Sequence, residues 1–217
     1  MRSGWIERIS KGVYKFVGET PTVYSTLSSY CAQLDKRIHI GASTALDLRG
    51  YSHYVAIGKP VAYVFSSKNQ RIPSWFERGK WEMSVKCFMS SVFGETEVGL
   101  ETMMIDGSEV LLSSPERAFM ECLHLSPVNY SLMDTYYVME MFTTLRPKLV
   151  QELLEVCTSV KVKRLFLYMA EKSGHSWFKA INTGGIDLGR GKRVCASNGK
   201  YIGQYKISIP RELADYE

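Results

Sequence analysis

The chain has 217 residues, long enough for one large domain or two small ones with a real hydrophobic core. Its composition, 45% hydrophobic and 23% charged, is typical of a soluble globular protein. A secretory signal and an apolar run of membrane-spanning length are both missing, so we expect a cytoplasmic protein without membrane contact. The five cysteines are widely spaced and form no C-x-x-C pair, which argues against a disulfide framework or a zinc site.

Charge is distributed unevenly along the chain, although the net charge is only +5. Residues 1–50 carry +3, residues 51–145 carry −4, residues 146–206 carry +8 and residues 207–217 carry −2. A strongly basic stretch of this kind favours a polyanion or an acidic protein surface as partner. The alternative is a solvated basic face that has no partner.

The predicted elements begin with a basic hairpin over residues 4–16, in which two short strands flank a turn at Lys11-Gly12. A winged-helix domain ends in such a hairpin. Only three residues lie upstream, so we expect the chain to lack the recognition helix that would precede it. The cations predicted to meet nucleic-acid phosphates here are Arg8, Lys11 and Lys15.

Helices and strands alternate in the next part of the chain. A helix is predicted to start at Thr20-Pro21 and to run to about Leu34. A short strand at 39–41 precedes a brief helix over 44–49, capped by Ser43 and closed by Gly50. Further strands are predicted at 61–65, 80–88, 100–105 and 109–111, and together they should form one mostly antiparallel sheet.

The remainder is predicted to be mainly helical, with strands at its end. Ser113 begins a helix through a capping box with Glu116. Further helices are predicted at 132–142, 146–156 and 161–172, and short strands near 193–196 and 205–209. The fold class is therefore α+β. We divide the chain into a wing remnant (1–18), an α+β domain (19–127) and a basic, mainly helical C-terminal region (128–217).

The helix over 161–172 has the clearest pattern, because apolar residues recur at the spacing of a buried stripe. Cations occupy the opposite face and crowd the first turns, where the helix dipole disfavours them. Cations at positions that the helix dipole disfavours indicate a functional role. The alternative, equally well supported, is that these lysines only solvate the surface of the helix. The predicted contact surface for a protein partner or nucleic acid consists of Lys161, Arg164 and Lys172, with Arg190, Lys192 and Arg193 of the following glycine-rich loop.

Motifs for catalysis are missing from the sequence. A metal-dependent nuclease needs D-x-K or E-x-K, which occurs nowhere, and no D-x-D follows Gly107-Ser108 as a nucleotidyltransferase would require. His39 and His53 flank the small helix, with Ser43, Asp47 and Ser52 nearby, so a hydrolytic triad is imaginable, but nothing resembles G-x-S-x-G. We therefore expect no enzyme activity, no cofactor and no metal site.

Taken together, the motifs resemble the AbiEi antitoxin family of type IV toxin–antitoxin systems. The stretches that carry the resemblance are GWIER (4–8), GVY (12–14), HIG (39–41), TALDLRGYSHY (44–54), SPERA (114–118), SVKVKRLFLY (159–168) and DLGRGKR (187–193). The resemblance implies a winged helix that represses its own operon. It also implies a C-terminal domain that counteracts a nucleotidyltransferase-like toxin without forming a stable complex with it.

Two expectations follow for this chain. Binding to operator DNA should be weak and should show little sequence preference, because base readout needs an element in the major groove. The antitoxin region at the C-terminal end of the chain should be complete. The alternative function is a stand-alone nucleic-acid-binding regulator that has no toxin partner.

Overall fold

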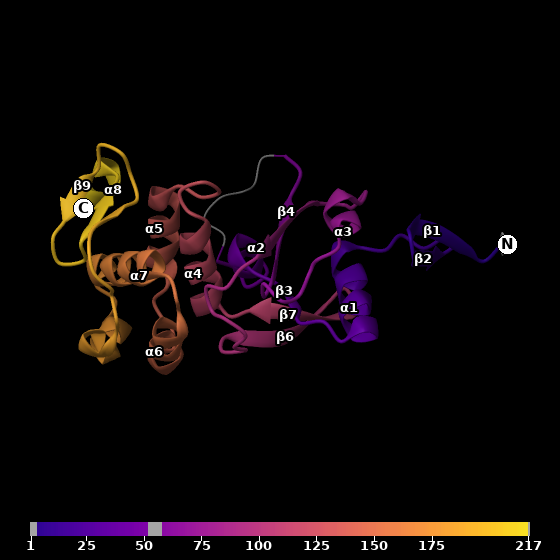
Figure 1. Cartoon of the computed structure of the whole chain (residues 1–217), viewed down its shortest axis with the longest axis horizontal. Coiled ribbons are helices and arrows are strands. Elements are labelled where there is room, and N and C mark those ends of the chain that lie inside the picture. The colour runs from indigo at the N-terminus through magenta and orange to yellow at the C-terminus, as the bar shows by residue number, and fades with distance from the viewer. Residues whose placement is uncertain (1–3, 52–57, 217) are drawn as a thin grey trace.

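The computed structural model describes residues 4–51 and 58–216. The molecule is elongated, with a hairpin at its N-terminal end, a mixed sheet and a group of helices in the middle, and a small sheet at its C-terminal end (Figure 1). The α+β class is confirmed. None of the helices in the described ranges has both the length and the apolar composition needed to cross a membrane.

The predicted hairpin is present. Strand β1 (Ile6–Ser10) pairs antiparallel with β2 (Val13–Phe16), and the turn between them uses Gly12 at φ +77°, a left-handed conformation that favours glycine. The hairpin projects from the rest of the molecule (Figure 1).

The central sheet has the strand order β5-β4-β3-β7-β6. Its strands are β3 (Ile38–Ile40), β4 (Val61–Ser66), β5 (Ser84–Met89), β6 (Leu100–Ile105) and β7 (Ser108–Ser113). The β4–β5 and β3–β7 pairs are parallel, and the β3–β4 and β6–β7 pairs are antiparallel. The expectation of a mostly antiparallel sheet is therefore wrong for half of the pairs. The short helix α3 (Ser74–Arg78) lies in the connection from β4 to β5, which returns the chain to the same end of the sheet.

Helix starts differ from the predicted ones by one or two residues. Helix α1 (Val23–Leu34) is capped by Thr22, whose hydroxyl accepts a hydrogen bond from the Ser25 N–H. Helix α2 (Ala42–Asp47) begins after Gly41 and not after Ser43. Helix α4 (Pro115–Leu125) is capped by Ser114, because the preceding serine still belongs to β7.

The helical part follows the prediction closely. Helices α5 (Leu132–Met141), α6 (Pro147–Val156) and α7 (Val160–Ser173) lie within one or two residues of their predicted bounds. Helix α7 packs against α4 and α5, and Phe166 makes an edge-on ring contact with Phe119 at 5.8 Å between centroids. The apolar stripe of α7 is fully buried, as predicted, and consists of Val162, Leu165, Phe166 and Met169.

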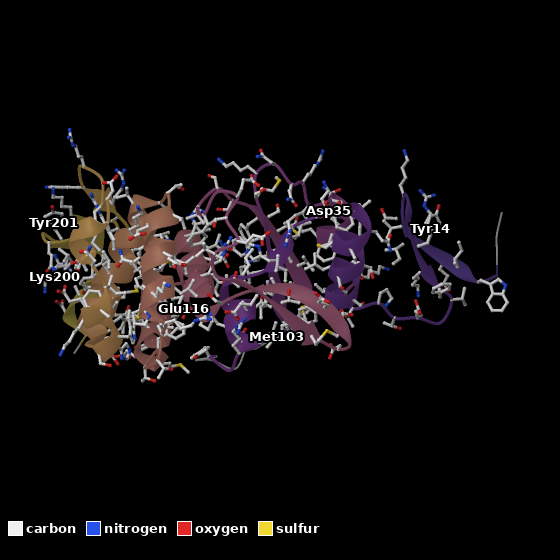
Figure 2. All side chains as sticks on the ribbon, turned by 90° about the horizontal axis from the view of Figure 1, so that it is seen from below. Tyr14, Asp35, Met103, Glu116, Lys200 and Tyr201 are labelled. Atoms are coloured by element: carbon white, nitrogen blue, oxygen red, sulfur yellow. The ribbon has the colours of Figure 1, made fainter. Side chains whose placement is uncertain are left out.

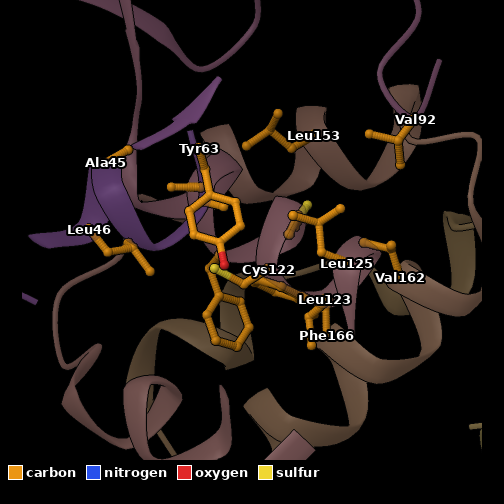
Figure 3. Packing of buried hydrophobic residues seen from close by; sticks show 14 of the residues in the cluster. Ala45, Leu46, Tyr63, Val92, Cys122, Leu123, Leu125, Leu153, Val162 and Phe166 are labelled. Atoms are coloured by element: carbon orange, nitrogen blue, oxygen red, sulfur yellow. The ribbon is translucent and has the colours of Figure 1, made fainter. Parts of the chain in front are cut away.

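One hydrophobic core runs from the sheet into the helices. Figure 3 shows side chains of α2, β4, α4 and α7 packed in one group, with Tyr63, Cys122 and Phe166 among them. The α+β part and the helical part therefore share their interior. The division at residues 127 and 128 stays a prediction.

The C-terminal part ends in a small sheet of order β8-β10-β9, formed by β8 (Arg193–Val194), β9 (Lys200–Ile202) and β10 (Ile207–Ile209). Two short 3₁₀ helices (Ser176–Ala180 and Thr183–Gly185) precede it, and α8 (Arg211–Asp215) follows. Strand β9 and the helices α3 and α8 have no counterpart among the predicted elements.

Candidate functional site

Exposed cations gather on the C-terminal sheet and on the loop over residues 187–193 that leads into it. Between residues 186 and 206 the only acidic residue is Asp187. The Lys200 ammonium forms an ion pair with the Asp215 carboxylate at 2.7 Å, and both side chains are more than half exposed. The C-terminal basic patch, as we name this surface, consists of Arg190, Lys192, Arg193, Lys200 and Lys206.

Apolar and aromatic groups lie among these cations. Val194 and Tyr201 are both register partners of Ser208 in β10, so they share one face of the small sheet. They are 73% and 43% exposed, respectively. The Lys192 ammonium lies 4.8 Å from the centre of the Tyr201 ring, within range of a cation–π interaction. An exposed ring within a basic surface is a combination that nucleic-acid-binding proteins use.

The predicted exposed face of α7 is wrong for Arg164. This side chain is only 1% exposed, and its guanidinium is enclosed by the loop 187–191 and by the turn before β10. The helical pattern identified the apolar stripe, but it did not predict that the loop 187–191 and the turn before β10 cover the opposite face of α7. The guanidinium donates to four carbonyl oxygens, those of Leu188 (2.9 Å), Gly189 (3.2 Å), Gly191 (2.7 Å) and Lys206 (3.0 Å).

The other cations of α7 are also bound to backbone carbonyls. The Lys161 ammonium donates to the carbonyls of His124 (2.7 Å) and Ser126 (2.6 Å), at the C-terminal end of α4. Lys163 donates to the carbonyl of Asp187, and Lys172 donates to that of Tyr216. Burial lowers the pKa of Lys161. The cations in the first turns of α7 therefore serve neighbouring backbone, which explains why they oppose the dipole of their own helix.

The six predicted C-terminal contacts thus divide into two groups. Lys161, Arg164 and Lys172 donate to backbone carbonyls of their own chain, and Arg164 is buried, whereas Lys161 and Lys172 are half-buried. The second group lies on the exposed loop and keeps its candidate role: Arg190, Lys192 and Arg193. Sequence reasoning missed Tyr201 and Lys200, because β9 is only three residues long and was not predicted.

The hairpin cations form a separate surface. Arg8 and Lys11 are exposed, and the Arg8 guanidinium also donates to the carbonyl of Ser10. Lys15 is partly neutralised, since its ammonium lies 3.0 Å from Glu7. Figure 2 shows the hairpin and the residues Lys200 and Tyr201 at opposite ends of the molecule. The hairpin and the C-terminal basic patch therefore cannot form a single site.

Two of the residues considered for a hydrolytic triad, His39 and Ser43, contact other side chains. The Nε2 atom of His39 lies 2.9 Å from Glu121, whereas the Ser43 hydroxyl lies 2.9 Å from that of Tyr130. His39 and Ser43 are thus held by different partners. Ser52 and His53 lie outside the described residues.

Glu121 is the centre of a buried polar network. It is 1% exposed and accepts hydrogen bonds from the Ala42 N–H, the Ser113 hydroxyl and the Arg117 guanidinium, besides its contact with His39. Burial would raise its pKa, but the charge and hydrogen bond of His39, together with Arg117 and the Ala42 N–H, hold it below its ordinary value. The network joins β3, α2, β7 and α4, so its evident role is to hold these elements together. Among residues 4–51 and 58–216 no cluster of three or more His, Cys, Asp or Glu side chains could hold a metal ion.

Comparison with known proteins identifies the family. A family model described as "Transcriptional regulator, AbiEi antitoxin, Type IV TA system" matches residues 59–210, and one described as "Transcriptional regulator, AbiEi antitoxin N-terminal domain" matches residues 1–57. Among solved structures, the crystal structure of the RV2827C protein from Mycobacterium tuberculosis is similar, with a TM-score of 0.59 and 13% sequence identity. The similarity covers 95% of this chain and 75% of that chain, and at this identity it shows the fold alone. No curated protein sequence matches the chain. Because a single family model covers more than half of the residues, the chain belongs to the AbiEi antitoxin family of type IV toxin–antitoxin systems.

Proposed function

We propose that the protein is an antitoxin that counteracts a nucleotidyltransferase-like toxin and that it also controls transcription by binding operator DNA. Membership of the family supports both roles, because the matching models are described as antitoxin and as transcriptional regulator. The observation that carries the proposal is the C-terminal basic patch, where five exposed cations lie on a small sheet and on the loops next to its strands.

The patch would act by attracting an oppositely charged partner. Exposed charge of one sign raises the rate of encounter with such a partner and orients it on approach. Its loop is held from inside by Arg164, so Arg190, Lys192 and Arg193 are presented on ordered backbone. Pre-organised contacts lose less conformational entropy when they bind.

The hairpin is proposed to add a second, weaker contact to DNA. Arg8 and Lys11, with a smaller share from Lys15, would meet phosphates, and this contribution should fall steeply with salt. A stand-alone regulator without a toxin partner stays the alternative function. A neighbouring reading frame for a nucleotidyltransferase-like protein would favour the antitoxin role.

A growth assay with co-expressed toxin tests the proposal. Reversing Arg190, Lys192 and Arg193 to Glu should abolish protection and leave the thermal midpoint nearly unchanged. The matched control reverses three exposed lysines elsewhere on the surface, Lys68, Lys80 and Lys148, and should protect as well as the parent. Equal protection by both variants would show that the patch is a solvated surface without a partner.

A further inference from the structure

We propose that the loop over residues 187–193 is a phosphate-binding site, in which the backbone N–H groups of Arg190 and Lys192 act together with the cationic side chains. Its biological role rests on the proposed function. Its chemistry follows from the way in which Arg164 holds the loop.

The argument begins with the direction of the loop carbonyls. The carbonyls of Gly189 and Gly191 both point inward to the Arg164 guanidinium. Each carbonyl shares a peptide plane with the N–H of the next residue, and in a trans peptide the two groups point in opposite directions. The N–H groups of Arg190 and Lys192 therefore point outward, away from the buried guanidinium.

These two N–H groups are available to a ligand. Neither one donates a hydrogen bond to another residue in the part of the chain that the structure describes. The N–H of Gly189, in contrast, is occupied, since it donates to the Asp187 carboxylate at 2.7 Å. Along the loop, the N–H groups of Arg190 and Lys192 thus point away from Arg164, and the carbonyls of Gly189 and Gly191 point toward it.

The glycines make this alternation possible. Gly189 has φ +61° and Gly191 has φ +75°, both in the left-handed region. Successive residues that alternate with left-handed glycines turn their N–H groups toward one side, which is the arrangement of anion-binding backbone concavities. Open space lies on the side of Gly191 where a Cβ would stand, so the loop is accessible there.

The local charge also favours an anion. Arg164 donates to carbonyl oxygens, and within the described residues none of its contacts is to a carboxylate, so its positive charge is not neutralised. Burial and the nearby Arg193 lower its pKa, and arginine nevertheless stays protonated in proteins. Arg190, Lys192 and Arg193 add exposed positive charge around the two N–H groups.

Phosphate is the anion that fits this set of donors best. Its tetrahedral group offers several oxygens, which can accept from two backbone N–H groups and from cationic side chains at once. Tyr201, next to Lys192, would provide a ring on which an attached base could stack. The phosphate could belong to a nucleic-acid backbone or to a small free phosphate, and the tests below separate these two sources.

The first test follows the backbone amide resonances of the whole chain during titration with inorganic phosphate. The N–H signals of Arg190 and Lys192 should move more than those of other exposed residues and should saturate. Chloride at equal ionic strength should move them little. Shifts that are no larger at these two positions than elsewhere on the surface would overturn the proposal.

The second test identifies the source of the phosphate. A fluorescent single-stranded oligonucleotide should bind about tenfold more weakly when Arg190, Lys192 and Arg193 are replaced by Ala, and less than about twofold more weakly in the Lys68, Lys80 and Lys148 alanine control. Competition by inorganic pyrophosphate at concentrations similar to those of the oligonucleotide would assign the site to small phosphates. Equal competition by poly-glutamate would show a general anionic surface and would contradict the phosphate site.

A third variant tests the positioning role of Arg164. Lysine at this position keeps the charge but cannot donate to four carbonyls. Arg164→Lys should therefore weaken oligonucleotide binding by about fivefold or more. It should also speed amide hydrogen exchange at residues 189–193, while exchange in α4 stays at the parent rate. Unchanged binding together with unchanged exchange would contradict this role.

The phosphate site and the proposed function can fail separately. If phosphate does not bind but reversal of the loop charges still abolishes protection, the patch contacts an acidic protein and the antitoxin role stands. If phosphate binds but protection is unaffected, the site exists and the proposed use of it is wrong.

Discussion

Two buried charged side chains, Glu121 of α4 and Arg164 of α7, are satisfied in different ways. Glu121 contacts His39 and accepts a hydrogen bond from Arg117, so its negative charge meets the positive charge of Arg117 within the interior. Arg164 meets only carbonyl oxygens among the described residues, and their dipoles satisfy its donors without cancelling its charge.

This difference separates a buried charge that is compensated within the interior from one that is not. Compensated charge inside a protein contributes little to the field outside, whereas an uncompensated buried cation adds to the surface potential nearby. Glu121 joins four elements of the α+β part. Arg164 supports a basic loop and strengthens the positive potential around it.

The largest expected effect comes from reversing the buried cation. Arg164→Glu places a carboxylate against four carbonyl oxygens, and we expect the free energy of unfolding to fall by about 4 kcal/mol or more. Arg190→Glu is the control, because this side chain is exposed on the loop that Arg164 holds, and it should change the same quantity by about 0.5 kcal/mol or less. Urea unfolding of both variants measures the contrast. Equal losses would mean that Arg164 is not enclosed.

Removal of the compensated carboxylate should have the next largest effect. Glu121→Ala leaves the Nε of Arg117, the Ala42 N–H and the Ser113 hydroxyl without their acceptor, and should cost about 3 kcal/mol. The exposed Glu109, on the neighbouring strand β7, provides the control for the same substitution. A loss below about 1 kcal/mol in urea unfolding would show that the network is replaceable by water.

Acid should weaken the same network. The pKa of Glu121 is held below its ordinary value, and so is that of Glu116, where burial is outweighed by the hydrogen bonds and charge of Arg146. A carboxyl whose folded pKa is lowered contributes stability above its unfolded pKa and loses it as the pH falls through the folded value. The urea midpoint of the parent should therefore decline below about pH 4.5. Glu121→Gln should decline less steeply, and an identical slope would contradict the assignment.

The smallest expected effect concerns the backbone of the loop. Gly191→Ala should cost about 1 kcal/mol, because φ +75° is strained for a residue with a Cβ even though space is open there. Gly203→Ala is the control, since it has neither a positive φ nor a close neighbour. A thermal melt of each should show a lower midpoint only for the first. Equal midpoints would show that the loop relaxes without cost.

Local patterns in the sequence determined much of this protein. The hairpin, the helices α5 to α7 and the buried stripe of α7 were all predicted, because turn chemistry and helical periodicity act over a few residues. The resemblance to the AbiEi family came from short motifs, and the family models confirm it. The distribution of charge also predicted a basic surface in the final third of the chain.

Tertiary structure alone decided the rest. The carbonyls that enclose Arg164 come from residues 24 to 42 positions later in the chain, and no local pattern specifies a contact of that range. Parallel pairing of β4 with β5 depends on the path of the connection between them, and β9 exists only because β10 lies beside it. The sequence therefore determined which residues are basic, but the packing of the C-terminal loop decided which of them bind backbone carbonyls and which stay exposed.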